Sequence, residues 1–339
     1  MNGKILQTNN YLIHNFFSLK GLIRVSGQQI ILPFYHAVSD RQLPHLNHLY
    51  HVRSIKKFKR DLEFYLKYYT PVSEARLSDH ITGKTAISGN AFFISFDDGL
   101  SECYDIIAPV LLEKGIPATF FINSAFVDNK DMMFRFKVSL LLNRLTDASC
   151  WEVVTNELLE QKGYQFSRVS DLFGYIKGMD YSDTKLLEDL AEKTGFDYKE
   201  YLAENKPYMT LEQIRDLQRK GFSIGAHSVD HPRYSQLSYD EMYRQTLDCL
   251  NFLKKNGVEA GTFSFPFTDV GVSKEYFNKI SQHIHLSFGG SGLKSDVIPF
   301  NLHRIPMEDS GLPASVRVKN EYIYYILKSL VNKNTINRN

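Results

Sequence analysis

The sequence predicts an α/β fold in which helices cover a mainly parallel sheet, either open or closed into a barrel. Short apolar runs alternate along the chain with stretches of helical periodicity, which is the pattern of successive strand–helix units. The run at residues 91–96 is apolar without alternation, as expected for a strand that is buried on both faces. With 339 residues, 43% of them hydrophobic, the chain can bury one large core.

The first part of the chain predicts three strands with helices between them. Apolar residues that recur every three or four positions favour a helix at 55–69. The stretch at 102–114 is a second helix, since a glycine and a proline follow it. The strands are expected at 30–35, 91–96 and 117–122.

Two capping boxes predict where helices begin in the second part of the chain. Thr210 with Gln213 opens a helix at 211–220, and Ser238 with Glu241 opens a helix at 239–255. Strands are expected at 222–226, 262–265 and 285–288, and further helices near 273–282 and 315–331.

The alternation of strand and helix patterns stops between Asn123 and Pro207, where the sequence is polar and helical. We interpret residues of about 125–207 as an insertion that emerges from a strand end, where barrels build their active-site face. Its candidate helices lie near 134–145, 151–161, 170–177 and 183–194. The predicted division is an N-terminal segment at 1–29, the barrel with its insertion at 30–310, and a C-terminal helix and tail at 311–339.

Composition argues against several classes of protein. The net charge of +2 gives no electrostatic reason to expect nucleic-acid binding. Three cysteines, odd in number and far apart, argue against a disulfide framework and against a thiolate zinc site.

The N-terminal sequence lacks the unbroken apolar stretch of a secretory signal, and no run is long enough for a membrane span. The expected location is therefore cytoplasmic. Residues 11–23 could form an amphipathic helix, either packed on the domain or in peripheral contact with a membrane surface. We favour packing on the domain.

Two adjacent carboxylates, Asp97 and Asp98, follow the buried run at 91–96. Such a pair is costly at the end of a buried strand unless a cation or hydrogen bonds offset the charge. One carboxylate could bind a metal ion while the other acts as a base. The alternative is an Asp-Asp-Gly turn that caps the following helix.

Two histidines, His227 and His231, follow the strand at 222–226. At this spacing they would lie on one face of a helical turn, so both imidazoles could reach one ion. Both polar signals fall at the carboxyl ends of strands, on the same face of the barrel. Two imidazoles and a carboxylate suit zinc or a neighbouring divalent ion.

These two motifs resemble those of the NodB-homology polysaccharide deacetylases, carbohydrate esterase family four. The family motifs read Thr-Phe-Asp-Asp-Gly and His-Ser/Thr-x-x-His-Pro, and this chain has Ser-Phe-Asp-Asp-Gly at 95–99 and His-Ser-Val-Asp-His-Pro at 227–232. The resemblance implies a distorted (β/α) barrel, typically with seven strands. It implies Asp97 as the catalytic base, and Asp98, His227 and His231 as the ligands of a divalent metal, with zinc as the first expectation.

Two further elements look like those of the family. The run Phe-Tyr-His-Ala-Val at 34–38 is similar to the Tyr-His-x-Val element of one branch, which puts His36 near the site. His36 could act directly or could pair with a neighbouring backbone group. Ser-Phe-Pro-Phe at 264–267 stands where the family has Arg-x-Pro-Tyr, so the backbone N–H of Phe267 would face the oxyanion. The missing arginine normally orients the base, so Asp97 is expected to be held differently.

The last family motif, Leu-x-His, supplies a general acid, and its nearest candidate here is His303, with a spacing that differs by one residue. An equally good alignment matches Arg304 and Ile305 with a branch that carries Arg-Ile at this place. Both alignments are kept open.

The resemblance implies an enzyme that hydrolyses the N-acetyl group of an amino sugar or polysaccharide in a metal-dependent reaction and releases acetate. Two alternatives are a deformylase or deacylase of a small amino-sugar conjugate, and a catalytically inactive relative that binds glycans. The expected partner is a carbohydrate, with no nucleic acid and no membrane span.

Overall fold

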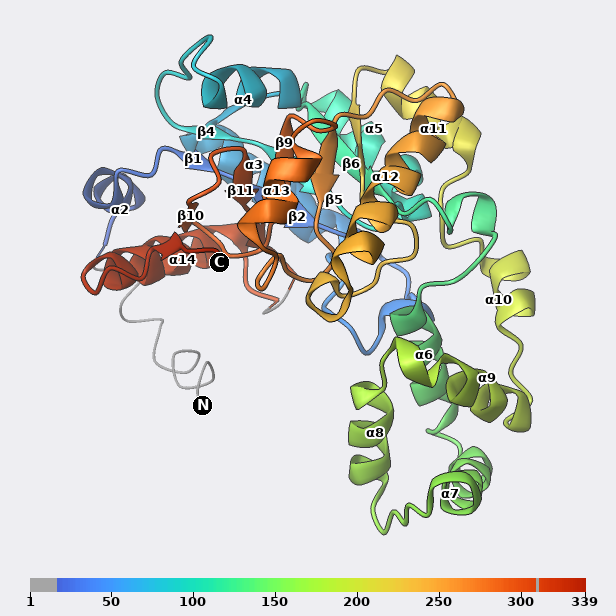
Figure 1. The fold of residues 1–339 in the computed structure, drawn as a ribbon. Helices are drawn as coiled ribbons and strands as arrows, with labels where there is room; N and C mark the ends of the chain where they lie inside the picture. The colour runs from blue at the N-terminus through green and yellow to red at the C-terminus, as the bar shows by residue number, and fades with distance from the viewer. Residues whose placement is uncertain (1–16, 309–310) are drawn as a thin grey trace.

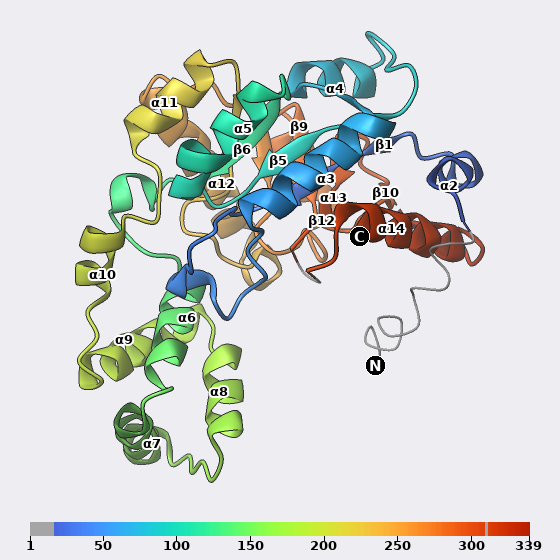
Figure 2. The ribbon, with the colours of Figure 1, turned by 180° about the vertical axis from the view of Figure 1, so that it is seen from behind.

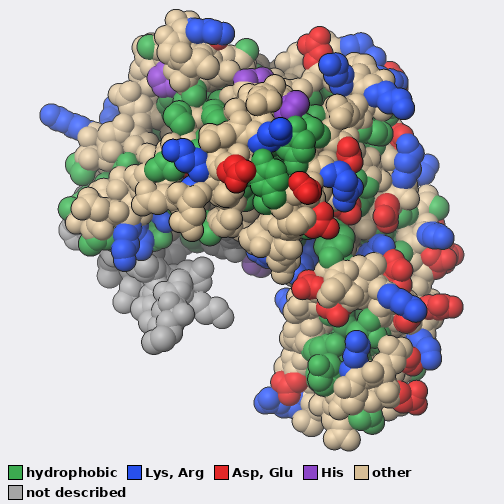
Figure 3. Space-filling view, in the orientation of Figure 1, with side chains coloured by type: hydrophobic (Ala, Val, Ile, Leu, Met, Phe, Trp, Pro, Cys, Tyr) green, Lys and Arg blue, Asp and Glu red, His purple; other side chains and the backbone are tan. Residues whose placement is uncertain are grey.

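The computed structural model describes residues 17–308 and 311–339 of the chain. Figure 1 shows a barrel body, with strands at its centre and helices outside, and a helical arm that projects from one end of the body. On the face drawn in Figure 3, acidic and basic side chains are interspersed, in line with the small net charge. No helix among the described residues combines the length and apolar character needed to cross a bilayer.

The barrel is formed by one parallel sheet whose two edges nearly meet. β11 and β12 are separated only by Arg304, yet β11 pairs with β9 and β12 pairs with β2, at opposite edges of the sheet. The chain therefore crosses from one edge to the other at Arg304, which confirms the distorted (β/α) barrel. The sheet of the described residues has eight strands where seven were expected, because Arg304 divides the last stretch into β11 and β12. In spatial order the strands are β11 (Asn301–His303), β9 (Leu286–Gly289), β8 (Thr262–Ser264), β7 (Ser223–Ala226), β6 (Ala118–Ile122), β5 (Ile94–Phe96), β2 (Pro33–Tyr35) and β12 (Ile305–Pro306).

Helices cover the outside of the barrel, as the alternating pattern predicted. α3 (Ile55–Tyr68) and α5 (Ala108–Glu113) lie over the face seen in Figure 2, and α12 (Tyr239–Lys255) and α13 (Lys274–Ile280) lie over the face seen in Figure 1. α11 (Leu211–Arg219) and α14 (Ala314–Ser329) complete the set of barrel helices that were predicted, and α4 (Glu74–Ile81) was not predicted.

Local sequence signals account for several helix ends. Both capping boxes are present. The side chains of Thr210 and Ser238 accept the backbone N–H groups of Gln213 and Glu241, whose side chains accept the backbone N–H groups of Thr210 and Ser238. The predicted helix at 102–114 differs in its first half, where Cys103–Ile107 is π-helical before α5 begins. Pro109 explains the irregularity, because it has no N–H to donate within a regular helical turn.

The helical arm has a small core of its own. The four candidate helices of this region are confirmed, and the arm helices bury one another through leucines such as Leu141, Leu158 and Leu187. A fifth helix near its end was not predicted. The arm consists of α6 (Phe134–Arg144), α7 (Ala148–Lys162), α8 (Val169–Gly178), α9 (Thr184–Lys193) and α10 (Tyr198–Asn205).

The N-terminal helix packs on the protein, as favoured from the sequence. α2 (Leu19–Ser26) buries Leu19, Leu22 and Ile23 and lies beside α14. Residues 11–16 of the proposed amphipathic segment lie outside the described residues. Short strands form two small sheets outside the barrel. In the first, β4 (Ala91–Phe92) lies between β1 (Ile30–Ile31) and β3 (Thr70–Pro71), and in the second β10 (Ser295–Asp296) pairs with β13 (Thr335–Ile336).

Candidate metal centre

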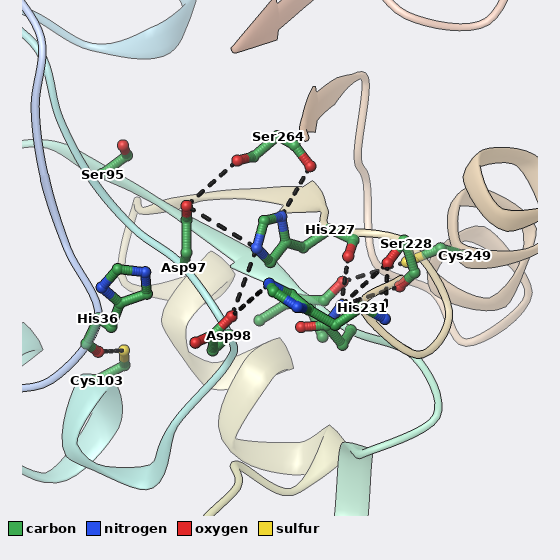
Figure 4. Close-up of polar contacts among 12 residues, drawn as sticks. His36, Ser95, Asp97, Asp98, Cys103, His227, Ser228, His231, Cys249 and Ser264 are labelled. Carbon is green, nitrogen blue, oxygen red and sulfur yellow. Dashed lines mark hydrogen bonds and ion pairs between the residues drawn. The ribbon is translucent and has the colours of Figure 1, made fainter. Parts of the chain in front are cut away.

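The two chemical motifs meet at one end of the barrel. Asp97 and Asp98 follow β5, and His227 follows β7, while β6 lies between these two strands. All three strands are parallel, so their carboxyl ends share one face. Figure 4 shows the side chains of Asp98, His227 and His231 pointing toward one another.

The three expected ligands lie at distances suited to one ion. The Oδ1 atom of Asp98 is 3.4 Å from Nε2 of His227 and 3.4 Å from Nε2 of His231. All ligand atoms of the three residues lie within 4.8 Å of one another, and all three side chains are buried. Zinc bonds of about 2.0–2.2 Å put two tetrahedral ligands roughly 3.3–3.6 Å apart. The spacing of these donors therefore fits a zinc-sized divalent cation.

The loop that carries the two histidines is not the helical turn that we expected. Ser228 has a φ of 71° and His231 a φ of 62°, both in the left-handed region. The hydroxyl of Ser228 accepts a hydrogen bond from the backbone N–H of His231 (3.0 Å), and the amide of Asn123 donates to the carbonyl of His227. These contacts, and not helical periodicity, bring the two imidazoles together.

Strained backbone is concentrated around this centre. Asp98 (φ 72°) and Phe267 (φ 57°) share the left-handed conformation with Ser228 and His231. Residues with side chains adopt this region at a cost, and such residues cluster at functional sites, where the surroundings hold them in place.

Both imidazoles are held in the neutral form that can bind a cation. Nδ1 of His227 lies 2.7 Å from the carbonyl oxygen of Ser264, so Nδ1 carries the proton and Nε2 presents its lone pair to the centre. Burial lowers the pKa of His231 to about 3, which keeps that ring neutral. Neutral imidazole is the form that binds metals.

One oxygen of the Asp98 carboxylate receives no hydrogen bond from the described residues. Burial alone would raise its pKa, but His231, His227 and His36 hold the pKa well below the ordinary range. Its Oδ1 atom is buried and has no hydrogen-bond partner among the described residues. A buried ionised oxygen without a partner is costly. A cation at this position would remove that cost, so the residues fit a bound metal.

Asp97 is held by Arg304, which takes the place of the arginine missing from the third motif. The guanidinium donates to both carboxylate oxygens of Asp97, at 2.8 and 2.7 Å, and to the hydroxyls of Ser95 (2.9 Å) and Ser264 (2.6 Å). Burial favours a raised pKa for Asp97, but the charge of Arg304 holds the pKa below its ordinary value. The Arg-Ile alignment in the sequence was the available signal for this arrangement.

His36 pairs with a carboxylate that sequence reasoning missed. Its Nδ1 atom lies 2.5 Å from Oε2 of Glu308, and Glu308 also accepts the backbone N–H groups of His36 and Ala37. Burial opposes the charge of the ring, but Glu308 outweighs burial and raises the pKa of His36 to about 9. Figure 4 shows the ring beside Asp97 and Asp98. No motif marks Glu308, because only the crossing of the chain at residue 304 brings it to β2.

Phe267 lies at the rim of the same centre. Its ring packs against His231 with centroids 4.6 Å apart, and its side chain is 43% exposed. The backbone N–H of Phe267 donates to no group in the described part of the chain. This N–H is therefore available to a bound molecule.

The structure does not bring His303 to the centre. Its Nε2 atom lies 3.0 Å from Asp296, and its Nδ1 atom lies 3.9 Å from Asp269, in a buried cluster that also contains Arg338. Neighbouring residues of a strand point to opposite sides. Because Arg304 points to Asp97, the preceding His303 points away from it.

One cavity of about 480 Å³ contains the whole centre. Its floor includes Asp97, Asp98, both histidines and Arg304, and its walls include residues of the arm. The hydroxyl of Tyr50, whose ring stacks on His36 at 4.5 Å, is buried there without a hydrogen-bond partner among the described residues. The walls also carry His48, Met133, Arg135, Val138, Leu142, Lys177 and Arg233.

Comparison with known proteins points to one family. The family model described as polysaccharide deacetylase matches residues 85–161 and 180–283, which is more than half of the chain. A search of curated proteins found no significant match.

Solved structures share the fold. The deacetylase PplD of Streptococcus pyogenes, solved in complex with acetate, aligns with a TM-score of 0.54 and 12% identity over 85% of this chain and 96% of its own. IcaB from Ammonifex degensii aligns with a TM-score of 0.54 and 15% identity over 86% and 97% of the two chains. A de-N-acetylase from Aggregatibacter actinomycetemcomitans aligns with a TM-score of 0.51 and 13% identity over 86% and 99%. At such identities the likeness concerns the fold.

Proposed function

The chain belongs to the polysaccharide deacetylase family and is a hydrolase of amide carbon–nitrogen bonds, and from this premise we propose that it removes the N-acetyl group of an amino sugar or glycan and releases acetate. The observation that carries the proposal is the convergence of Asp98, His227 and His231, with Asp97 free of that triad but in the same cavity. One structural neighbour, the deacetylase PplD, was solved in complex with acetate, which is consistent with this product.

The triad would hold a divalent cation, with zinc as the first candidate. Such a cation supplies Lewis acidity, since it polarises a carbonyl and lowers the pKa of water. Ser264 fixes the tautomer of His227, and burial keeps His231 neutral, so both rings can donate a lone pair.

Asp97 is proposed as the general base. Arg304 keeps its carboxylate ionised and fixes its plane with two hydrogen bonds. In this state Asp97 takes a proton from the water that attacks the acyl carbon. The free N–H of Phe267 donates to the oxygen of the tetrahedral intermediate as negative charge develops there.

His36 is proposed as the general acid, in place of His303. It lies in the same cavity, and its pKa of about 9 means that the ring carries its proton at neutral pH. The protonated ring can transfer that proton to the leaving nitrogen as the carbon–nitrogen bond breaks. Glu308 holds the ring through Nδ1, so Nε2 is the nitrogen that faces the substrate.

The decisive experiment measures acetate release from a panel of N-acetylated sugars and glycans, with and without a chelator. We expect release that the chelator abolishes and that added Zn²⁺ restores, with metal content measured in parallel. Release that continues unchanged in metal-free protein would contradict the metal-dependent mechanism. N-formylated sugars in the same panel separate deacetylation from deformylation.

A further inference from the structure

Three cationic side chains line the cavity that contains the triad. Arg135 on α6 and Lys177 on α8 come from the arm, and Arg233 stands two residues after His231. The two arginines are half-buried, and Lys177 is exposed. The arm therefore contributes charge to the site as well as a wall.

None of the three cations forms an ion pair within the described residues. Arg135 donates to the backbone carbonyl of Lys177 (2.9 Å), and the guanidinium of Arg233 lies 4.7 Å from the centre of the Phe267 ring. Burial, followed by the nearby charge of Arg233, lowers the pKa of Arg135. Two like charges thus lie close to each other, and the charge of Asp180 acts on Arg135 in the opposite direction without forming an ion pair.

The acids of the cavity do not offset this charge. Asp97 and Asp98 are the carboxylates that line it among the described residues, and Asp97 is already paired with Arg304, while Asp98 faces the two imidazoles. Asp180 lies outside, in an adjoining recess that it shares with Arg135 and Arg233. The part of the cavity wall that Arg135, Lys177 and Arg233 form is therefore positive.

We infer that the substrate carries a phosphate ester, which Arg135, Arg233 and Lys177 bind while its N-acetyl group lies at the triad. The inference rests on the proposed function and narrows the substrate class to an amino sugar linked to phosphate. Planar guanidinium groups donate paired N–H bonds to phosphate oxygens, and an ammonium adds a compact third charge. A soluble sugar phosphate and a lipid-linked sugar both offer such a phosphate, and its contacts with the three cations are the same for the two.

The test compares kcat/KM of the metal-loaded enzyme on matched substrates. The panel contains N-acetylglucosamine, its neutral methyl glycoside, N-acetylglucosamine 1-phosphate, a polyprenyl-pyrophosphate-linked N-acetylglucosamine in detergent, and N-acetylmuramic acid as a carboxylate. We expect at least one phosphorylated sugar to exceed the neutral sugars about tenfold or more, with an advantage that shrinks as salt rises. Whichever phosphorylated substrate, soluble or lipid-linked, shows the larger increase in kcat/KM identifies the source of the phosphate.

Variants connect the preference to the three cations. Arg135→Gln and Arg233→Gln should each lower the ratio of kcat/KM, phosphorylated over neutral, about tenfold, because each removes a charge-assisted contact. Arg135→Lys should retain most of the ratio. The matched control is Arg244→Gln, on the exposed surface of α12 beside Asp248, which should leave the ratio unchanged.

The inference is overturned if neutral sugars react as well as phosphorylated ones, if the carboxylate sugar is preferred, or if neither glutamine variant changes the ratio. If no sugar of the panel releases acetate, the proposed function fails instead. In that case the direct binding of N-acetylglucosamine 1-phosphate, measured by calorimetry with wild-type, Arg135→Gln and Arg233→Gln proteins, still decides the inference.

Discussion

Asp97 directly follows strand β5, and Arg304, at the crossing of the chain, donates hydrogen bonds to both of its carboxylate oxygens. Its expected role separates it from the neighbouring Asp98. We predict that Asp97→Asn retains bound metal and lowers kcat about a hundredfold or more, because an amide cannot accept the proton. His227→Ala should lose both metal and activity, because it removes a ligand.

Metal analysis and acetate release, measured on the same samples, check this pair of variants. Full activity of Asp97→Asn would remove the residue from the mechanism. Loss of metal from Asp97→Asn would instead assign Asp97 to the support of the cation.

The protonation of His36 predicts how kcat/KM depends on pH. Its pKa is raised to about 9, so the ring is protonated below that pH and loses its proton above it. If the ring is the general acid, kcat/KM should hold from neutral pH upward and fall as the pH rises through about 9. Glu308→Gln removes the carboxylate that raises the pKa, so it should move this alkaline limb to lower pH.

Complete pH profiles of the wild-type protein, Glu308→Gln and His36→Gln provide the measurement. His36→Gln should lose about a hundredfold in kcat/KM and should lose the alkaline limb. If kcat/KM of Glu308→Gln still falls near pH 9, the alkaline fall belongs to the titration of a group other than His36.

The grouping of Asp98, His227 and His231 could be predicted from sequence because each half of it is a short contiguous motif after a strand. Arg304 and Glu308 could not be placed in the same way. They reach Asp97 and His36 only because the chain crosses between the sheet edges after β11, and no local pattern encodes that crossing. The same geometry explains why His303, next to Arg304, faces a different cluster.

At the scale of elements, the signals that succeeded were periodicity and capping. Long helices such as α12 repeat their apolar face over several turns and begin at a capping box. Two-residue strands such as β10 and β13 have no period to detect, and they form only because tertiary contacts align them.

The capping box of α11 gives a prediction for an element. The hydroxyl of Thr210 accepts the N–H of Gln213 (3.2 Å), and the Gln213 side chain accepts the N–H of Thr210 (2.8 Å). Thr210→Ala removes the first bond and should lower the free energy of unfolding by about 1 kcal/mol. Chemical denaturation measures the change, and Thr210→Ser, which keeps the hydroxyl, should stay close to the wild type. Equal losses in both variants would assign the effect to packing.

On the scale of the whole molecule, the end of the chain is tied to the barrel through a buried ionic cluster. Arg338 donates through Nε to Asp296 (2.9 Å) and also contacts the carboxylate of Asp269, and its side chain is 2% exposed. His303, on β11, contacts Asp296 from the other side. The cluster therefore joins the C-terminal tail, the loop after β8 and the last part of the barrel, none of which are neighbours in sequence.

Removal of Arg338 should consequently destabilise the entire fold. Arg338→Gln leaves two buried carboxylates without their cation, which costs about 3–5 kcal/mol in the free energy of unfolding. Arg338→Lys keeps the charge but loses the forked geometry, so it should fall between the glutamine variant and the wild type. Chemical denaturation of the metal-loaded proteins at neutral pH measures the difference.

The acid dependence of stability separates this ionic role from simple packing. Burial favours a raised pKa for Asp296, but hydrogen bonds from His303 and Arg338 hold it well below its ordinary value of about 3.9. A group whose folded pKa is depressed stabilises the fold above its unfolded pKa, and this stabilisation is lost as the pH falls below about 4. Arg338→Gln removes part of the depression, so its stability should depend less steeply on pH in this acid range. If wild type and variant lose stability in parallel as the pH falls from about 4 to about 2, Arg338 acts through packing and the ionic account of the cluster is wrong.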